Sequence, residues 1–360
     1  MTRAVEHRYF YVGGRYCRSA GKTSRVDQAY VHHLAPLDGR AAYPIVMIHG
    51  GGLTGLCWES TPDGRAGWAD FFARRGFPTY VMDQPARGRS AWSPEEHGDL
   101  IHPEAGRIER HFTAIADFNL WERAKLHTRW PGSGRVGDPV FDQFFSSMVP
   151  FVRDRHLSER LATAAGTALL DEIGPAILMT HSQSGPHGWH IADARPDLVK
   201  AIIAIEPSGP PFMRHEEVGP PKVRIEVGVD KPWGIAATPL VSDPPVVGRA
   251  GLPYVREEEA DAPDLVPAYV QADPPRRLPN LANIPVAVVT SEAGYHAAYD
   301  HSTVKFLRSA GVETDHIRLE EAGVHGNGHM LMIEQNSDEI AELLRAWLDD
   351  RGLAGPGASD

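Results

Sequence analysis

Short apolar runs recur along the chain and predict a sheet whose strands are buried on both faces. Such runs occupy residues 43–48, 79–82, 176–179, 200–205 and 284–290. Runs of this length without polar alternation are typical of strands in parallel sheets. Segments with apolar residues at helical spacing lie at 68–75, 155–173, 184–194 and around 304–307. Strands that alternate with helices in this way predict an α/β fold with a mostly parallel central sheet flanked by helices.

The two ends of the chain extend this pattern. Residues 8–16 and 27–34 alternate β-branched or aromatic side chains with polar ones, so we expect antiparallel strands at one end of the sheet. Residues 315–319 predict a last strand, and Ile340, Leu344 and Trp347 share one face of a predicted C-terminal helix.

Two stretches interrupt the alternation and predict insertions. Residues 93–155 mix aromatic and polar side chains, and residues 207–279 hold 15 of the 30 prolines. We therefore predict a single domain over 1–360, with a core at about 8–92, 170–206 and 284–350 and cap or lid insertions at about 93–155 and 207–283. Their aromatic residues suggest an apolar pocket, although packing inside the cap explains them equally well; they are Phe112, Phe118, Trp121, Trp130, Phe141, Phe144, Phe145, Trp233 and Tyr254.

Composition narrows the class of protein. Hydrophobic residues make up 42% and charged residues 23%, as in ordinary soluble enzymes. Lys and Arg number 36 against 47 Asp and Glu, and the net charge of −11 disfavours a nucleic-acid or anionic-membrane partner. Because no run of 18 apolar residues occurs, we expect no membrane span. Cys17 and Cys57 lack disulfide-framework or metal-ligand spacing, which favours the cytoplasm. A homodimer is compatible with the sequence.

Residues 180–185 predict an exposed nucleophile. The apolar run 176–179 leads into Thr180-His181-Ser182-Gln183-Ser184-Gly185, which we interpret as a strand, a sharp turn and a helix. This geometry presents the Ser182 hydroxyl at the end of the sheet, although a serine that caps a helix would fit the same pattern. A serine is a weak nucleophile on its own, so the hypothesis requires a base.

Other strand ends supply the remaining groups that acyl transfer needs. The carboxyl ends of parallel strands meet at one edge of a sheet. His329 lies in a glycine-rich loop after the last strand and is the predicted base. The acid that orients it is Glu206, after one buried strand, or Glu292, after the next.

A glycine-rich loop after the strand at 43–48 predicts an oxyanion-binding site. In His49-Gly50-Gly51-Gly52, the missing side chains let the backbone approach a ligand. We expect the backbone N–H groups of Gly51 and Gln183 to bind the oxyanion, with Gly52 as second choice for the loop donor.

These motifs resemble those of the α/β-hydrolase superfamily. The order Ser, acid, His is that of the superfamily, residues 180–185 resemble its nucleophile elbow, and residues 83–90 resemble its Asp-x-x-Gly-x-Gly-x-Ser turn. Residues 58–64, Glu206-Pro207 and residues 325–330 are similar to a branch of bacterial esterases whose triad acid is a Glu after the sixth strand. The resemblance implies a serine esterase with the triad Ser182, His329 and Glu206, with Glu292 as the alternative acid, and no cofactor.

The predicted activity is hydrolysis of a small-molecule carboxylic ester or lactone, with a hydrophobic or aromatic substrate favoured. A catalytically silent hydrolase-like binding protein is one alternative. A dinucleotide-dependent oxidoreductase is another, because Gly50-x-Gly52-x-x-Gly55 matches a phosphate-binding fingerprint and Asp83 comes at the end of the next strand. We predict no metal site, since His187 and His190 have no carboxylate at ligand spacing. An unperturbed imidazole pKa near 6.5 predicts that activity falls below about pH 7.

Overall fold

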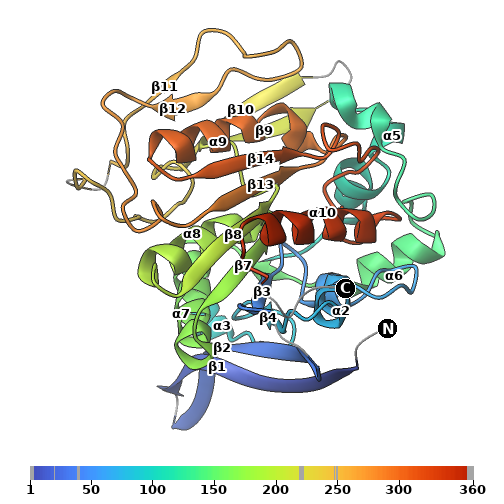
Figure 1. Ribbon diagram of the computed structural model, residues 1–360, viewed down its shortest axis with the longest axis vertical. Helices are drawn as coiled ribbons and strands as arrows, with labels where there is room; N and C mark the ends of the chain where they lie inside the picture. Colours follow the sequence, from blue (N-terminus) through green and yellow to red (C-terminus); the bar gives the residue numbers. More distant parts are fainter. Residues whose placement is uncertain are drawn as a thin grey trace.

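An eight-stranded sheet forms the centre of the protein (Figure 1). The computed structural model describes residues 4–19, 21–38, 41–218, 223–246, 248 and 250–354. In spatial order the strands are β1 (Val5–Ser19), β2 (Lys22–Pro36), β4 (Thr79–Asp83), β3 (Ile45–Ile48), β7 (Ala176–His181), β8 (Val199–Ile205), β13 (Val286–Thr290) and β14 (Thr314–Arg318). The six strands from β4 to β14 run parallel, whereas β1 and β2 are antiparallel. The mostly parallel α/β fold predicted from the sequence is confirmed.

Successive side chains of the central strands pack in two hydrophobic layers, one on each face of the sheet. Ile45 and Met47 of β3 pack in one layer with α2 (Trp68–Arg74) and α10 (Ser337–Asp350). Val46 and Ile48 point the other way and pack with helices α7 (Arg155–Ile173), α8 (Gly185–Ala194) and α9 (Asp300–Ser309). Since successive side chains of a strand point to opposite faces, helices on both faces explain why these runs are continuously apolar.

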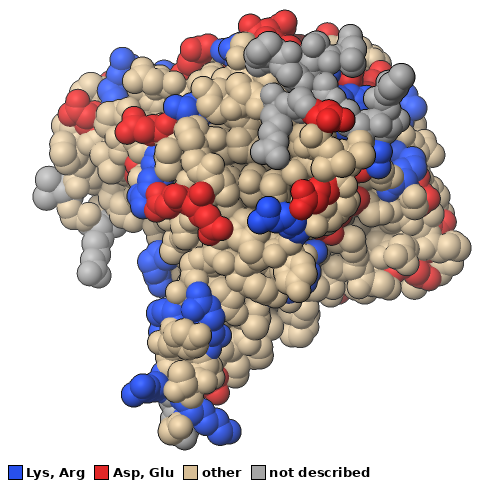
Figure 2. Space-filling view, turned by 60° about the horizontal axis from the view of Figure 1, so that its bottom comes forward, with Lys and Arg blue, Asp and Glu red and all other residues tan. Residues whose placement is uncertain are grey.

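The first two strands form a long hairpin at one end of the molecule, where it stands out from the helical layers (Figure 1). Figure 2 shows lysine and arginine side chains gathered on this end. The strands carry Arg8, Arg15, Arg18, Lys22 and Arg25. The hairpin is therefore locally basic within an acidic chain, so the net charge does not describe every face of the protein.

The two predicted insertions contain short elements outside the central sheet. The first holds α3 (Pro94–His97), β5 (Leu100–Ile101), α4 (Ala105–Ile108), η1 (Glu109–Thr113), α5 (Ile115–Phe118), η2 (Glu122–Leu126), α6 (Pro139–Ser147) and β6 (Phe151–Val152). The second holds two small hairpins, β9 (Phe212–Val218) with β10 (Val223–Lys231) and β11 (Tyr254–Arg256) with β12 (Tyr269–Gln271). Positions 219–222, 247 and 249 of the second insertion lie outside the described residues.

The remaining short elements are α1 (Leu56–Glu59), η3 (Ser182–Ser184) and η4 (Tyr295–Ala298). None of the helices in the described ranges has the length and apolarity needed to cross a bilayer.

Truncating Phe72 should destabilise the fold. This side chain of α2 is fully buried and packs against Phe71 and Phe77. Phe72→Ala leaves a cavity in the layer between α2 and the sheet, so we expect the free energy of unfolding to fall by about 3–5 kcal/mol in denaturant titration. Leu37→Ala is the matched control because Leu37 is 62% exposed, and it should change that free energy by less than about 0.5 kcal/mol.

Candidate active site

Ser182 sits at a strained turn between β7 and α8. Its φ is +54°, a left-handed value that is uncommon for a residue other than glycine. The turn continues into η3, and the Ser182 carbonyl oxygen accepts a 2.9 Å hydrogen bond from the backbone N–H of Ser208. Such strain is typical of functional sites, and here it presents the hydroxyl at the carboxyl end of β7.

The residues two positions before and after Ser182 fit this turn although neither is glycine. Thr180 is buried, and its methyl group lies where Gly188 of α8 leaves space, because a Cβ at Gly188 would come within 2.8 Å of it. Ser184 donates from its hydroxyl to the Ile48 carbonyl oxygen at 2.7 Å and accepts from the His181 N–H at 2.8 Å. Ser184 therefore ties the turn to the neighbouring strand β3.

Glu206 and His329 are joined by a short hydrogen bond. Glu206 Oε2 lies 2.5 Å from His329 Nδ1, and both side chains are buried. The other oxygen of Glu206 accepts from the Ser291 backbone N–H at 2.8 Å and also from the Ser291 hydroxyl. Glu206 itself has φ +40° at the end of β8, so the strand terminates in a second strained residue. These contacts fix both the carboxylate and the imidazole.

Burial and hydrogen bonding set the protonation of this pair. Burial lowers the pKa of His329 below its ordinary value of 6.5, although Glu206 opposes the shift. Burial alone would raise the pKa of Glu206, yet its pKa is lowered by the hydrogen bond from His329 and by the nearby imidazoles. An ionised Glu206 accepts the Nδ1–H of His329, which leaves Nε2 with a lone pair. His329 is thus prepared to accept a proton at Nε2.

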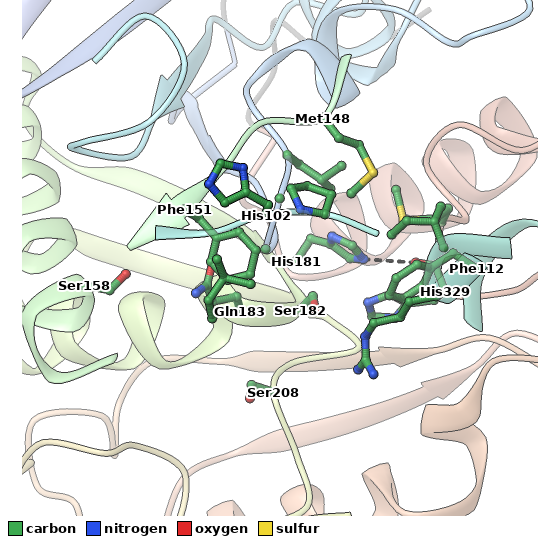
Figure 3. A pocket seen from close by; sticks show the side chains of 18 of the residues that line it. His102, Phe112, Met148, Phe151, Ser158, His181, Ser182, Gln183, Ser208 and His329 are labelled. Carbon is green, nitrogen blue, oxygen red and sulfur yellow. Dashed lines mark hydrogen bonds between the residues drawn. The ribbon is translucent and has the colours of Figure 1, made fainter. Parts of the chain in front are cut away.

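Both Ser182 and His329 line one cavity (Figure 3). Within the described residues no hydrogen bond joins their side chains; His329 Nε2 lies 3.5 Å from the Tyr295 hydroxyl instead. Four rings surround His329, those of Phe112, Tyr295, His296 and His181, at centroid distances of 4.5 to 5.2 Å. Bonds between a nucleophile and its base are often formed only when substrate is bound, so the shared cavity is the relevant observation.

The alternative acid, Glu292, contacts a different histidine. Its two carboxylate oxygens lie 3.0 Å from His325 Nδ1 and 2.8 Å from the backbone nitrogen of Gly326. The structure therefore pairs Glu206 with His329 and Glu292 with His325. Glu292 holds the loop that carries His329 rather than the imidazole itself.

The glycine-rich loop after β3 packs directly on the nucleophile turn. A Cβ at Gly50 would come within 2.7 Å of His181 Nδ1 and 3.1 Å of Ser182 Cβ, so only glycine permits this approach. Gly51, Gly52 and Gln183 all line the cavity beside Ser182. The predicted oxyanion-binding residues thus line the same cavity as the Ser182 hydroxyl.

Arg87, which the sequence did not indicate, links both sides of that predicted oxyanion site. Its guanidinium is buried and donates to the Gly50 carbonyl oxygen at 2.9 Å and to Gln183 Oε1 at 3.1 Å. In a trans peptide the C=O and N–H point in opposite directions, so fixing the Gly50 carbonyl also fixes the direction of the Gly51 N–H. Ser291 was missed as well, and its position directly after β13 was the available signal.

The cavity has a volume of about 320 Å³ and a largely apolar wall from the first insertion. This wall consists of Ile101, Ile108, Phe112, Phe144, Met148 and Phe151. Of the nine aromatic residues predicted to form a pocket, only Phe112 and Phe144 line it. Trp130 and Phe141 pack in one layer of the core, and Trp233 packs in the other. Most of these rings therefore pack in the cap and core, which was the alternative explanation, while other apolar side chains line the pocket.

Both carboxylate oxygens of Asp83 are occupied by hydrogen bonds within the protein. Its carboxylate is buried and accepts hydrogen bonds from the Gly55 N–H at 2.7 Å and from three nitrogens of Arg89 at 2.8 to 3.0 Å. These bonds close the turn after β4 and leave no oxygen for a ribose hydroxyl. The glycine fingerprint that suggested a dinucleotide therefore serves the contact with the nucleophile turn.

Three potential metal ligands do converge, at Glu206, His296 and His329, whose ligand atoms lie within 4.8 Å of one another. A zinc ion shared by Glu206 and His329 would hold their ligand atoms about 3.3 Å apart. The observed 2.5 Å is a hydrogen-bond distance, so the residues do not fit a shared ion as they stand. His190, considered from the sequence, contacts Glu159 at 3.3 Å and Thr238 at 2.8 Å.

Ser182 should react with a fluorophosphonate probe in a pH-dependent way. His329 can accept the serine proton only when neutral, and burial lowers its pKa, so labelling should persist below pH 6.5 and its acidic midpoint should lie below that value. The sequence-based expectation assumed an unperturbed imidazole, and burial of His329 moves the expected midpoint to lower pH. The measurement is the labelling rate by mass spectrometry from about pH 4.5 to 8.

Glu206→Gln should slow labelling at every pH, because the amide neither orients nor stabilises the imidazolium. Glu292→Gln is the matched control and should label at the original rate. If the two variants exchanged these behaviours, the assignment of the acid would be wrong.

Comparison with known proteins agrees with the fold. The model of the Alpha/beta hydrolase family matches residues 45–343. A protein from Fungal sp. (strain ATCC 74256), "Probable secreted lipase phiG", is 42% identical over 340 residues, which cover 94% of this chain and 88% of that protein. A solved structure described as a novel bacterial esterase is 25% identical with a TM-score of 0.63, covering 97% of this chain and 96% of the other. The predicted cytoplasmic location stays a prediction. The chain belongs to the alpha/beta hydrolase family.

Proposed function

We propose that this protein hydrolyses carboxylic esters or lactones through Ser182, His329 and Glu206. The observation that carries the proposal is the buried Glu206–His329 hydrogen bond of 2.5 Å, whose imidazole faces the cavity that also holds the strained Ser182. The similarity to proteins described as a lipase and an esterase supports the same class of reaction.

The first step forms an acyl-enzyme. Ser182 Oγ attacks the carbonyl carbon of the ester while His329 Nε2 takes its proton, and Glu206 stabilises the imidazolium through Nδ1–H. The N–H groups of Gly51 and Gln183, with Gly52 as the second choice in the loop, stabilise the oxyanion of the tetrahedral intermediate. His329 then gives the proton to the leaving alcohol oxygen as the ester C–O bond breaks.

Water completes the cycle. A water molecule attacks the acyl carbon as His329 accepts one of its protons, and the same proton passes to Ser182 Oγ when the acyl–serine bond breaks. The products are a carboxylic acid and the alcohol, or a hydroxy acid from a lactone. Residues of the chain perform each of these proton transfers.

The cavity limits the size and polarity of the substrate. At about 320 Å³ it is at the small end of ligand pockets, and the first insertion supplies its apolar wall. We infer that the substrate is a small ester with a substantial apolar part. The second insertion contributes only Ser208 among the described lining residues, so the first insertion supplies more of the cavity wall than the second.

Turnover distinguishes an esterase from a silent binding protein of the same fold. Purified protein should hydrolyse p-nitrophenyl esters of short acyl chains, with a burst when deacylation is slow. Ser182→Ala should lower kcat by at least about 1000-fold because it removes the nucleophile. Equal rates for Ser182→Ala and the unmodified protein, or no turnover across chain lengths, would leave the binding protein as the correct interpretation.

Arg87→Met should lower kcat by about 100-fold with a smaller effect on KM, since it releases the Gly50 carbonyl and lets the Gly51 N–H turn away from the oxyanion. Arg107→Met is the matched control, because Arg107 lines the same cavity without a contact to the oxyanion loop, and it should leave kcat nearly unchanged. Thermal unfolding of both variants checks that the difference is not loss of the fold. An unchanged kcat in folded Arg87→Met would contradict the role.

A further inference from the structure

One wall of the cavity carries polar side chains that lack protein partners. His187 of α8 is buried, with 1% exposure, yet neither of its ring nitrogens forms a hydrogen bond with any described residue. The hydroxyls of Ser158 and Ser208 line the same cavity and also have no partner in the described part of the chain. Buried polar groups are nearly always hydrogen-bonded, so the unpaired Nδ1 of His187 indicates that a bound molecule supplies its partner. The two serine hydroxyls face the same cavity and can contribute to that contact.

The position of the polar wall relative to Ser182 can be followed in the structure. In Figure 3 Ser158 and Gln183 are on the opposite side of Ser182 from His329 and Phe112, and Ser208 lies below Ser182. His187 comes five residues after Ser182 on the turn that becomes α8, which is roughly 7 Å at the rise of a helix. The polar wall is therefore within reach of a short substrate chain.

The position of His329 decides which part of the substrate meets this wall. His329 must protonate the leaving alcohol oxygen, so the alcohol lies on the His329 side of Ser182. The acyl chain then extends from the carbonyl carbon toward the other side. The polar wall is thus part of the acyl-binding region.

The charges around the wall disfavour an ionic substrate group. Glu159 lines the cavity as a buried carboxylate, and hydrogen bonds from His190 and Thr238 lower its pKa to about 2 against the effect of burial, so it stays ionised. Its oxygens also accept from the Ala237 and Thr238 backbone N–H groups at 2.9 and 2.8 Å. Arg155, a cation on the same wall, is paired with Asp230. An anionic acyl group on this wall would face the Glu159 carboxylate, and the Arg155 cation there is already paired.

His187 itself is uncharged at neutral pH. Burial lowers its pKa to about 3, an effect that the nearby Glu159 carboxylate opposes and the Arg87 guanidinium reinforces. A neutral imidazole offers one N–H donor and one acceptor, and each serine hydroxyl can donate or accept. This set matches a carbonyl or hydroxyl group rather than a charged one.

We propose that His187, Ser158 and Ser208 form a polar acyl subsite that binds an uncharged carbonyl or hydroxyl oxygen on the acid part of the substrate. This inference rests on the proposed ester hydrolysis. The substrate class is then the esters of oxo or hydroxy carboxylic acids, or their lactones, rather than esters of plain hydrocarbon acids. The leaving alcohol remains in the apolar region near Phe112.

The test compares p-nitrophenyl esters of equal chain length in which one methylene at successive positions is replaced by a carbonyl. At the best position, kcat/KM of the oxo ester should exceed that of the hydrocarbon ester by about 10- to 100-fold, because the oxygen pairs groups otherwise left unpaired. In His187→Phe this ratio should fall toward one.

His102→Phe is the matched control. His102 lines the same cavity beside the apolar wall, so the same substitution there should leave the ratio unchanged. Fluorophosphonate labelling of Ser182 and thermal unfolding check that His187→Phe is folded. Ser158→Ala and Ser208→Ala give independent variants in which the ratio should fall several-fold.

The outcomes separate the two proposals. Absence of turnover and of Ser182 labelling would overturn the esterase assignment. Efficient hydrolysis of hydrocarbon esters with a ratio near one at every position would overturn the subsite alone. A high ratio that survives in folded His187→Phe and in both serine variants would also overturn it.

Discussion

The hydrogen bond between Glu206 and His329 is the interaction on which the arrangement of the site depends. A buried carboxylate is costly unless it is fully hydrogen-bonded, and Glu206 meets that requirement with Ser291 on one oxygen and His329 on the other. These three residues come from the ends of β8 and β13 and from the loop after β14. Three neighbouring strands must therefore end in register for the bond to form. The parallel sheet provides that register, which explains why the chemistry lies at its carboxyl edge.

A residue with strained backbone geometry follows each of the strands β7 and β8 at the edge of the sheet where the site lies. Ser182 and Glu206 both have positive φ, and both come directly after a buried strand. Their turns pack on each other, because a Cβ at Gly185 would come within 2.5 Å of Pro207, and the Ser182 carbonyl accepts from the Ser208 N–H. Each strained turn therefore holds the other, and the cost of about 1–3 kcal/mol for each residue is offset by contacts that only this geometry permits.

The central fold was accessible from the sequence because its strands are buried on both faces. Such strands give continuous apolar runs, and Ser182 and Glu206 could be placed because each comes directly after one of these runs. The cavity wall was not accessible. Its residues come from the first insertion, where elements of two to nine residues carry no clear period, and most predicted pocket aromatics pack elsewhere. Arg87 was also missed, because its partners Gly50 and Gln183 lie 37 and 96 residues away along the chain.

Polar and apolar side chains around Ser182 come from different parts of the structure, the core and the first insertion. Phe112 near His329 belongs to the first insertion, whereas His187 belongs to a core helix that begins directly after the nucleophile turn. A core helix is held by the sheet, so His187 has a fixed orientation relative to Ser182 and can discriminate geometry at an atom of the substrate. The insertion can change its side chains without disturbing the sheet. In the proposed acyl subsite, His187 is therefore the member whose position the sheet fixes most directly, whereas the side chains of the first insertion can vary more freely.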